Sequence, residues 1–310
     1  QVNNEYDVVI VGGGPAGLSA AMMLGRCSRR VLLVDSGEYR NSVSKASHGF
    51  LTRDGTSPAD LRRIGREQLV QYGVVVKPDQ VMAARALQAD ERRPGENSGF
   101  ILGLNATGAV RARKVILATG VVDVLPGIPG LMTVYGESVW TCPYCDAWEY
   151  RGKTLGVLGP KGADFAILRL TWASDVVYFA NGAPVSVADE ARLATLGIRT
   201  LRSAVQEIDS DARGCRVWVN NTAIHRAAIF LKSEVRQRSR LSIQLGIRDQ
   251  LSEAIKHTHN GATSVPGLYI AGDMAQEHYF VVNAASEGAN AGVAAHEEIH
   301  REDVRKGSVR

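Results

Sequence analysis

The chain is poor in cysteine and lacks any long apolar run. It has 310 residues, of which 4 are cysteines, and aromatic residues make up 6% of the chain. A structural disulfide is not expected, because no secretion signal is seen and reducing compartments keep ordinary thiols open. No apolar stretch approaches the ~20 residues that a membrane span requires, and the start shows no charged-then-apolar targeting pattern. We therefore expect a soluble cytoplasmic protein with no membrane partner.

The chain also has few clusters of residues with the same charge. The formal net charge is +4, without the lysine clusters and interleaved aromatic residues that indicate a nucleic-acid groove. The one compact basic stretch, residues 236–240, is best interpreted as a solvated face, although it could also steer an acidic protein. We expect no nucleic-acid partner. The length predicts two domains of about 150 residues each.

Two of the four cysteines form the motif Cys142-Pro143-Tyr144-Cys145-Asp146. Cysteines separated by two residues can close a short disulfide, and a helix starting at Pro143 would lower a thiol pKa. Asp146 could exchange a proton with a departing thiolate, so thiol–disulfide redox catalysis is the leading hypothesis. A structural disulfide would not need this acid.

A zinc site is the other interpretation of these cysteines. It usually needs four ligands, but Cys27 and Cys215 stand alone and His257 with His259 is the only close histidine pair. We therefore expect no metal site, and we interpret Cys27 and Cys215 as packing residues.

A dinucleotide-binding pattern begins near the start of the chain. The β-branched run 8–11 predicts a buried strand, the glycines of the next loop fit the dinucleotide fingerprint, and residues 18–24 predict a helix. A second strand ends in an acid about 20 residues on, where a ribose hydroxyl would be held. The predicted contacts of this region are Gly12, Gly14, Pro15, Ala16, Gly17, Asp35 and Ser36.

Three later segments are expected to approach the same cofactor. Asn41 and the polar stretch 47–55 predict a loop over it, in which His48 either touches the cofactor or is an ordinary surface histidine. The predicted strand 115–120 ends in Thr119 and Gly120, where the backbone can come close. The strand 268–273 ends in Gly272-Asp273, which could hold a ribitol or phosphate region.

A second strand–helix–strand pattern starts with residues 155–159, 163–172 and 175–180, but its glycine loop is poor. If Gly159 takes the first glycine position, the second and third fall on Lys161 and Asp164, which obstruct a pyrophosphate. The second strand ends without a ribose-binding acid and without the arginines that would bind a 2′-phosphate, and a shifted loop using Gly162 would bind only weakly. Efficient use of NADPH is therefore not expected.

The order of these patterns predicts an α/β fold. We expect two Rossmann-like βαβ domains, the second inserted into the first, each with a mainly parallel sheet and a small antiparallel excursion. The first domain would comprise residues 1–120 and 240–310, and the second, which carries the cysteine pair, residues 121–239.

Together these motifs resemble the low-molecular-weight thioredoxin reductase family over nearly the whole chain. The resemblance rests on the first glycine loop, Ala118-Thr119-Gly120, the Cys142–Asp146 motif and Gly272-Asp273. It implies FAD as cofactor and a homodimer, with Cys145 nearest the flavin, Cys142 exchanging with the substrate and Asp146 as the acid. Electrons would pass from reduced FAD to the disulfide and on to a thioredoxin-like protein or a small disulfide.

The poor second loop leaves the electron donor open. In this respect the chain resembles pyridine-nucleotide-independent members, such as the deeply rooted and ferredoxin-linked thioredoxin reductases, whose donor could be ferredoxin. It also resembles flavin-dependent dithiol oxidases of the gliotoxin and holomycin type, which pass electrons from a dithiol to oxygen. Asp146 ranks the reductase first, because an acid suits protonation of a released thiolate. A flavoprotein redox sensor that binds a partner without turnover is a third hypothesis.

Overall fold

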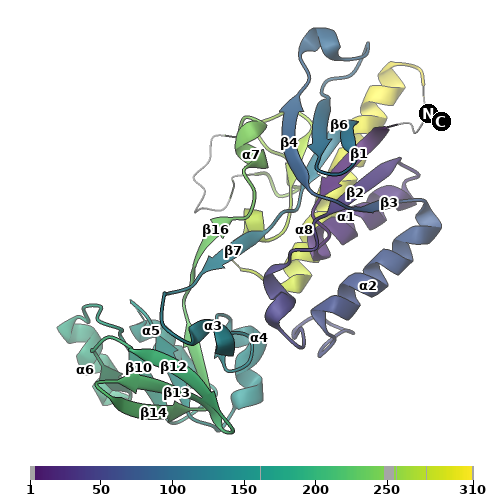
Figure 1. Cartoon of the computed structure of the whole chain (residues 1–310). Helices are drawn as coiled ribbons and strands as arrows, with labels where there is room; N and C mark the ends of the chain where they lie inside the picture. The colour runs from purple at the N-terminus through teal and green to yellow at the C-terminus, as the bar shows by residue number, and fades with distance from the viewer. Residues whose placement is uncertain (1–3, 161, 248–254, 256, 277, 309–310) are drawn as a thin grey trace. The chain divides into compact units, whose positions relative to one another are not determined.

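A computed structural model describes residues 4–160, 162–247, 255, 257–276 and 278–308 (Figure 1). The chain divides into two compact units. Unit 1 comprises Gln1–Ser42, Thr56–Asp123 and Val235–Arg310, and unit 2 comprises Val43–Gly55 and Val124–Glu234. The predicted division placed its limits at residues 120 and 240 and kept residues 43–55 in the first domain. In the structure this segment belongs with unit 2.

Unit 1 is built on a seven-stranded sheet in the order β3-β2-β1-β6-β5-β4, with β17 also paired to β6. The four strands β3, β2, β1 and β6 run parallel, and β5 and β4 continue the sheet in antiparallel fashion. The C-terminal part of β6 pairs with β17, and its N-terminal part pairs with β5. The strands are β1 (Glu5–Val11), β2 (Val31–Asp35), β3 (Val75–Pro78), β4 (Val81–Ala86), β5 (Phe100–Leu104), β6 (Gly108–Leu117) and β17 (Leu268–Ile270).

The predicted strand 115–120 is the C-terminal part of a longer strand, β6, which begins at Gly108 and ends at Leu117. Arg111 and Arg113 alternate with buried neighbours at the period of a strand, so these two charged residues do not interrupt β6. The observed length allows one strand to pair with both β5 and β17.

Helices in unit 1 pack through small residues. A Cβ added to Gly288 of α8 (Val281–Arg305) would lie 1.9 Å from the carbonyl oxygen of Ala16 in α1 (Pro15–Arg26), so the two helices pack at close range. Apolar clusters cover both faces of the sheet. The remaining helices are η1 (Arg40–Val43), α2 (Pro58–Leu69), η2 (Val70–Tyr72), η3 (Ala89–Glu91), α7 (Leu241–Gln244) and η5 (Asp273–Ala275).

Unit 2 contains a parallel five-stranded sheet in the order β11-β10-β9-β15-β8 and an antiparallel sheet β12-β13-β14. Its strands are β8 (Val139–Trp140), β9 (Leu155–Leu158), β10 (Val176–Phe179), β11 (Arg199–Leu201), β12 (Glu207–Asp211), β13 (Gly214–Val219), β14 (Thr222–Arg226) and β15 (Ala228–Leu231). Its helices are α3 (Leu131–Val134), α4 (Pro143–Asp146), η4 (Ala147–Tyr150), α5 (Ala163–Arg169) and α6 (Val187–Thr195).

The chain passes between the units in β7 (Val121–Val124) and β16 (Glu234–Gln237), which pair with each other as a two-stranded ribbon (Figure 1). The parallel sheets with antiparallel additions confirm the predicted fold class. In the described part of the chain, no helix is both long and apolar enough to cross a membrane.

Candidate active site

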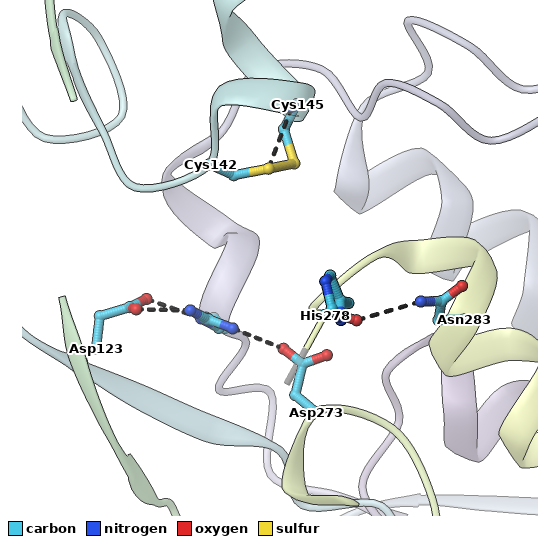
Figure 2. Close-up of a disulfide and its surroundings, with 7 residues drawn as sticks. Asp123, Cys142, Cys145, Asp273, His278 and Asn283 are labelled. Atoms are coloured by element: carbon cyan, nitrogen blue, oxygen red, sulfur yellow. Dashed lines mark hydrogen bonds and ion pairs between the residues drawn. A yellow bond between two sulfur atoms is a disulfide. The ribbon is translucent and has the colours of Figure 1, made fainter. Parts of the chain in front are cut away.

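The two cysteines of the motif lie at the start of α4 in unit 2 and form a disulfide (Figure 2). Cys142 is the N-cap, and its sulfur accepts a hydrogen bond from the backbone N–H of Cys145 at 3.1 Å. Pro143 occupies the first helical turn, where its missing N–H costs nothing. The local sequence therefore folds so that a backbone donor faces the Cys142 sulfur, which favours a thiolate there after reduction.

Asp146 ends the same short helix and is half-buried. Burial raises its pKa to about 7, the negative charge of Glu149 adds to the rise, and His48 opposes it. A carboxyl group with this pKa can give a proton to a thiolate or take one from a thiol at neutral pH. This is the chemistry that thiol–disulfide exchange needs next to its sulfur atoms.

His48 lies in the Val43–Gly55 segment of unit 2, with the redox motif. Its Nε2 atom is 3.7 Å from a Glu149 carboxylate oxygen, and its Nδ1 atom is 3.6 Å from Asp54. The sequence pattern associated this histidine with the flavin loop. The structure places it beside Glu149, the carboxylate whose charge helps to raise the pKa of Asp146.

The four aromatic residues around the disulfide divide into two kinds. Trp140 donates to the Tyr150 hydroxyl at 3.1 Å, and that hydroxyl donates to the carbonyl of Glu137 at 2.7 Å, so this pair is part of the packing. Tyr144 and Trp148 are each 61% exposed. The exposed pair flanks Cys145 in sequence and provides an apolar surface next to the redox motif.

The glycine loop of unit 1 forms a cradle between β1 and α1. Gly12 has φ +113°, and its N–H donates to Val34 at 2.8 Å. A Cβ at Gly17 would lie 1.8 Å from the carbonyl oxygen of Gly12, so only glycine fits there. A Cβ at Gly14 would meet no atom within 4 Å, and Gly14 is the N-cap of α1. This open N-terminus, with Pro15 and Ala16 in its first turn, fits the pyrophosphate of a dinucleotide.

Asp35 lies at the end of β2, as the ribose position requires. It is 7% exposed and accepts hydrogen bonds from the Gly37 N–H, the Tyr39 hydroxyl and Arg66. The next residue, Ser36, is exposed.

The other predicted contacts of unit 1 also follow strand ends or nearby loops. The Asn41 side chain accepts from Arg62 at 3.1 Å, and the Gly272 N–H donates to Glu287 at 2.8 Å. Thr119 and Gly120 follow β6, and Asp273 follows β17 by way of Ala271 and Gly272. The open glycine cradle and the acid at the end of β2 fit FAD.

The corresponding loop of unit 2 starts in the same way. Gly159 has φ +110°, and its N–H donates to Phe179 at 3.0 Å, as that of Gly12 does to Val34. The hydroxyl of Tyr178, a side chain that is 1% exposed, then fills the turn. It donates to the Gly159 carbonyl at 3.0 Å and accepts from the Gly162 N–H at 3.1 Å.

The remaining features of this second loop also differ from a nucleotide site. Ala180 follows Phe179 at the place where Asp35 follows Val34 in unit 1. The N–H of Gly162, which a shifted loop would offer to a phosphate, is already bonded to Tyr178. Lys161, one of the two expected obstacles, lies outside the described residues, and Asp164 pairs with Arg192 at 2.7 Å. The Gly162 N–H is thus already engaged by the protein itself, whereas Gly14, the N-cap in unit 1, has open space beside it.

An open glycine cradle in one unit and a cysteine pair beside an acid in the other define a flavin-dependent disulfide oxidoreductase. Residues 6–289 match the family described as pyridine nucleotide-disulphide oxidoreductase, and the chain belongs to this family. It is an FAD-dependent enzyme of the thioredoxin reductase-like kind.

Similar proteins support this assignment, and the similarity extends over most of their length. The chain is 34% identical to "Probable thioredoxin reductase" of Arthroderma benhamiae, with 96% of this chain and 81% of the relative covered. It is 30% identical to "Thioredoxin reductase tcpT" of Claviceps purpurea, with 96% and 95% covered. The crystal structure of HlmI superposes with a TM-score of 0.91 at 32% identity, covering 98% of this chain and 95% of that one.

Sequence reasoning missed several residues at these sites, including Arg40, Glu149 and Tyr178. Glu149 could have been found, because it lies one helical turn after Asp146. Tyr178 is the one polar side chain in an otherwise apolar strand, but its hydroxyl partners are known only from the fold.

Burial raises the pKa of Cys215 to about 11, which suits a packing residue. Within the described residues, no group of three or more metal-ligating side chains could hold a metal ion.

Proposed function

We propose that this enzyme exchanges electrons between FAD and an external thioredoxin-like protein or small disulfide through the Cys142–Cys145 pair, without a nicotinamide nucleotide in the second glycine loop. The observation that carries this proposal is a disulfide beside Asp146, a carboxyl group with a pKa of about 7. The reductase direction is proposed first, since a protonated Asp146 can neutralise the thiolate that each exchange step releases.

FAD, when bound, supplies or accepts the two electrons of the cycle, and the Gly12–Gly17 loop, Asp35 and Asp273 are proposed to hold it. From the reduced pair, the Cys142 thiolate attacks the substrate disulfide and forms a mixed disulfide, releasing one substrate thiolate. The Cys145 thiolate then attacks the Cys142 sulfur, which restores the protein disulfide and releases the second substrate thiolate. Asp146 provides a proton to a leaving sulfur.

Substrate access is proposed to involve the exposed rings of Tyr144 and Trp148. Both are 61% exposed, and Arg151 lies over the Trp148 ring at 4.1 Å. Aromatic residues of this kind are enriched at protein interfaces. This surface therefore supports a thioredoxin-like protein as partner.

The opposite direction is the second candidate. Tyr178 occupies the loop where a nucleotide donor would bind, whereas a dithiol substrate would bring its own electrons. An acid with a pKa near 7 can also accept a proton from a thiol. A dithiol oxidase that passes electrons to oxygen would use the same residues.

The flavin absorbance of the purified holoenzyme tests these alternatives. The protein is mixed anaerobically, in turn, with NADPH, NADH, reduced ferredoxin and a simple dithiol. We expect no rapid bleaching with either nicotinamide, and rapid bleaching with NADPH would contradict the proposal for the second loop. Bleaching by ferredoxin with reduction of a disulfide supports the reductase. Bleaching by dithiol alone, with recovery in air, supports the oxidase, and a flavin that responds to none of them would favour a sensor.

A further inference from the structure

Arg40 binds two aspartates in unit 1, Asp123 and Asp273. Figure 2 labels both aspartates and marks their contacts with dashed lines. Its Nε and Nη2 atoms donate to the two carboxylate oxygens of Asp123 at 2.8 and 2.7 Å, and Nη1 donates to Asp273 at 3.1 Å. The guanidinium carbon also lies 4.0 Å from the centre of the Tyr279 ring. A guanidinium with this many directional contacts is fixed in position.

The three charged side chains are largely removed from water. Their exposed fractions are 19% for Arg40, 7% for Asp123 and 22% for Asp273. Burial raises the pKa of Asp273, and the charge of Arg40 opposes that rise. The positive charge of Arg40 therefore stabilises the ionised form of both carboxylates. Loss of Arg40 would leave two partly buried carboxylates without a counter-charge.

The two aspartates belong to different functional segments. Asp273 begins η5, the turn after β17 that carries a predicted cofactor contact. Asp123 lies in β7, one strand of the ribbon through which the chain leaves unit 1. The guanidinium of Arg40 thus joins the cofactor turn to the connecting ribbon.

The second strand of the ribbon reaches the same turn independently. The Gln237 side chain of β16 donates to the carbonyl oxygen of Met274 at 3.0 Å, in a buried position. The Thr119 hydroxyl is 3.6 Å from the Met274 sulfur. Both strands of the ribbon are therefore attached to η5, one through Arg40 and one through Gln237.

We propose that Arg40 is a positioning residue that orients the Asp273 carboxylate for FAD and, through Asp123, couples cofactor binding to the order of the β7–β16 ribbon. This inference rests on the cofactor role proposed above for Asp273. With FAD bound, Asp273 would be held by Arg40 on one side and could accept from the cofactor on the other, and this shared contact would restrict the guanidinium further. Because coupling is reciprocal, FAD protects the ribbon, and an ordered ribbon strengthens FAD binding.

The test compares FAD affinity with amide hydrogen exchange in residues 121–124. Apo-protein is titrated with FAD, and exchange is measured with and without the cofactor in wild type, Arg40→Met and Asp123→Asn. Arg40→Met is expected to weaken FAD binding by about 10-fold or more and to abolish the FAD-dependent protection. Asp123→Asn keeps the Arg40–Asp273 pair, so FAD affinity should change by less than about 3-fold while the protection is lost.

Arg29→Met is the matched control, because Arg29 is 14% exposed and pairs with Asp303 at 2.9 Å elsewhere in unit 1. It should change neither reading. FAD-dependent protection that persists in Asp123→Asn would overturn the proposed coupling through Asp123 and would leave the Gln237–Met274 contact as the link. This variant decides the question even if Arg40→Met does not fold.

Asp273→Ala distinguishes the cofactor contact proposed for Asp273 from the positioning role proposed for Arg40. If it weakens FAD binding while Arg40→Met does not, only the positioning role of Arg40 fails. If Asp273→Ala leaves FAD affinity unchanged, the cofactor contact proposed for Asp273 fails, and the inference about Arg40 fails with it.

Discussion

The glycine loops of the two units share a framework but differ in what fills them. In both, a glycine with φ near +110° follows the first strand and donates its N–H to the neighbouring parallel strand. In unit 1 the N-cap of α1 is two residues later and has open space beside it, whereas in unit 2 the N-cap of α5 is three residues later and is bonded to Tyr178. The same turn can therefore serve a ligand or be closed by the protein itself.

The neighbouring residues reinforce this difference. Leu33 of β2 and Tyr178 of β10 hold matching positions, as do Asp35 and Ala180. Unit 1 has an open glycine cradle, whereas unit 2 has the same strand–loop–helix framework with a filled turn and carries the cysteine pair. A βαβ framework alone thus says little about whether a nucleotide binds.

The largest effect is expected from the cysteine pair, which provides the chemistry proposed for unit 2. Cys142→Ser and Cys145→Ser should each lower multiple-turnover exchange with a disulfide or dithiol by about 1,000-fold or more, because neither leaves a thiol pair. Both should retain FAD, since the cradle lies in unit 1. Steady-state turnover and the flavin-to-protein ratio provide the two measurements, with Cys27→Ser as control. Substantial turnover in either variant would place the redox chemistry elsewhere.

The open cradle of unit 1 can be tested with one methyl group. Gly14 has φ −75°, and a Cβ there meets no protein atom, so Gly14→Ala should fold with an unchanged apo-protein melting temperature. It should weaken FAD binding by about 10- to 100-fold, because the methyl group would occupy the space assigned to the pyrophosphate.

Gly17→Ala is the contrasting variant for this test. Its Cβ would lie 1.8 Å from a backbone oxygen, so the apo-protein itself should be destabilised. FAD titration and thermal unfolding of both apo-proteins distinguish the two effects. Equal FAD affinity in Gly14→Ala and wild type would rule out the cradle as the cofactor site.

Replacement of Asp146, the acid next to the cysteine pair, should have a smaller effect on the rate, and this effect should depend on pH. Asp146→Asn is expected to slow disulfide reduction about 10-fold at neutral pH if Asp146 donates the proton. The protonated fraction falls above the pKa of about 7, so the wild-type rate should decline at higher pH and the Asn variant should lose that break. Glu149→Gln should move the break to lower pH, because the charge of Glu149 raises the pKa of Asp146. An identical pH profile in Asp146→Asn would remove this residue from the mechanism.

Much of this comparison could be predicted from the sequence, because it depends on short-range patterns. Glycine spacing, apolar strands and Asp35 locate the first cradle, and the cysteine spacing locates the redox motif. The poor second loop was inferred from Lys161 and Asp164, yet the structure adds a different obstacle in Tyr178. That hydroxyl comes from a strand 16 residues beyond Gly162, and its contact with the loop depends on parallel pairing of β9 and β10.

Long-range contacts explain the other gaps. His48 lies about 100 residues before Glu149 in sequence, and no local pattern indicates that they meet. The Arg40 cluster likewise combines three distant segments. Such contacts depend on chain topology, which residue spacing does not specify.

The smallest effect is expected from Tyr178→Phe, which removes only the hydroxyl that closes the second loop. The Gly162 N–H and the Gly159 carbonyl would lose their shared partner, at a cost of about 1–2 kcal/mol in the free energy of unfolding. FAD affinity should stay unchanged, since the variant lies in unit 2. NADPH affinity should not appear, because residues 180–184 offer neither an acid for a ribose hydroxyl nor an arginine for the 2′-phosphate of NADPH. Denaturant unfolding and calorimetric titration with NADPH test these expectations, and NADPH binding gained in the variant would show that the Tyr178 hydroxyl alone closes the loop.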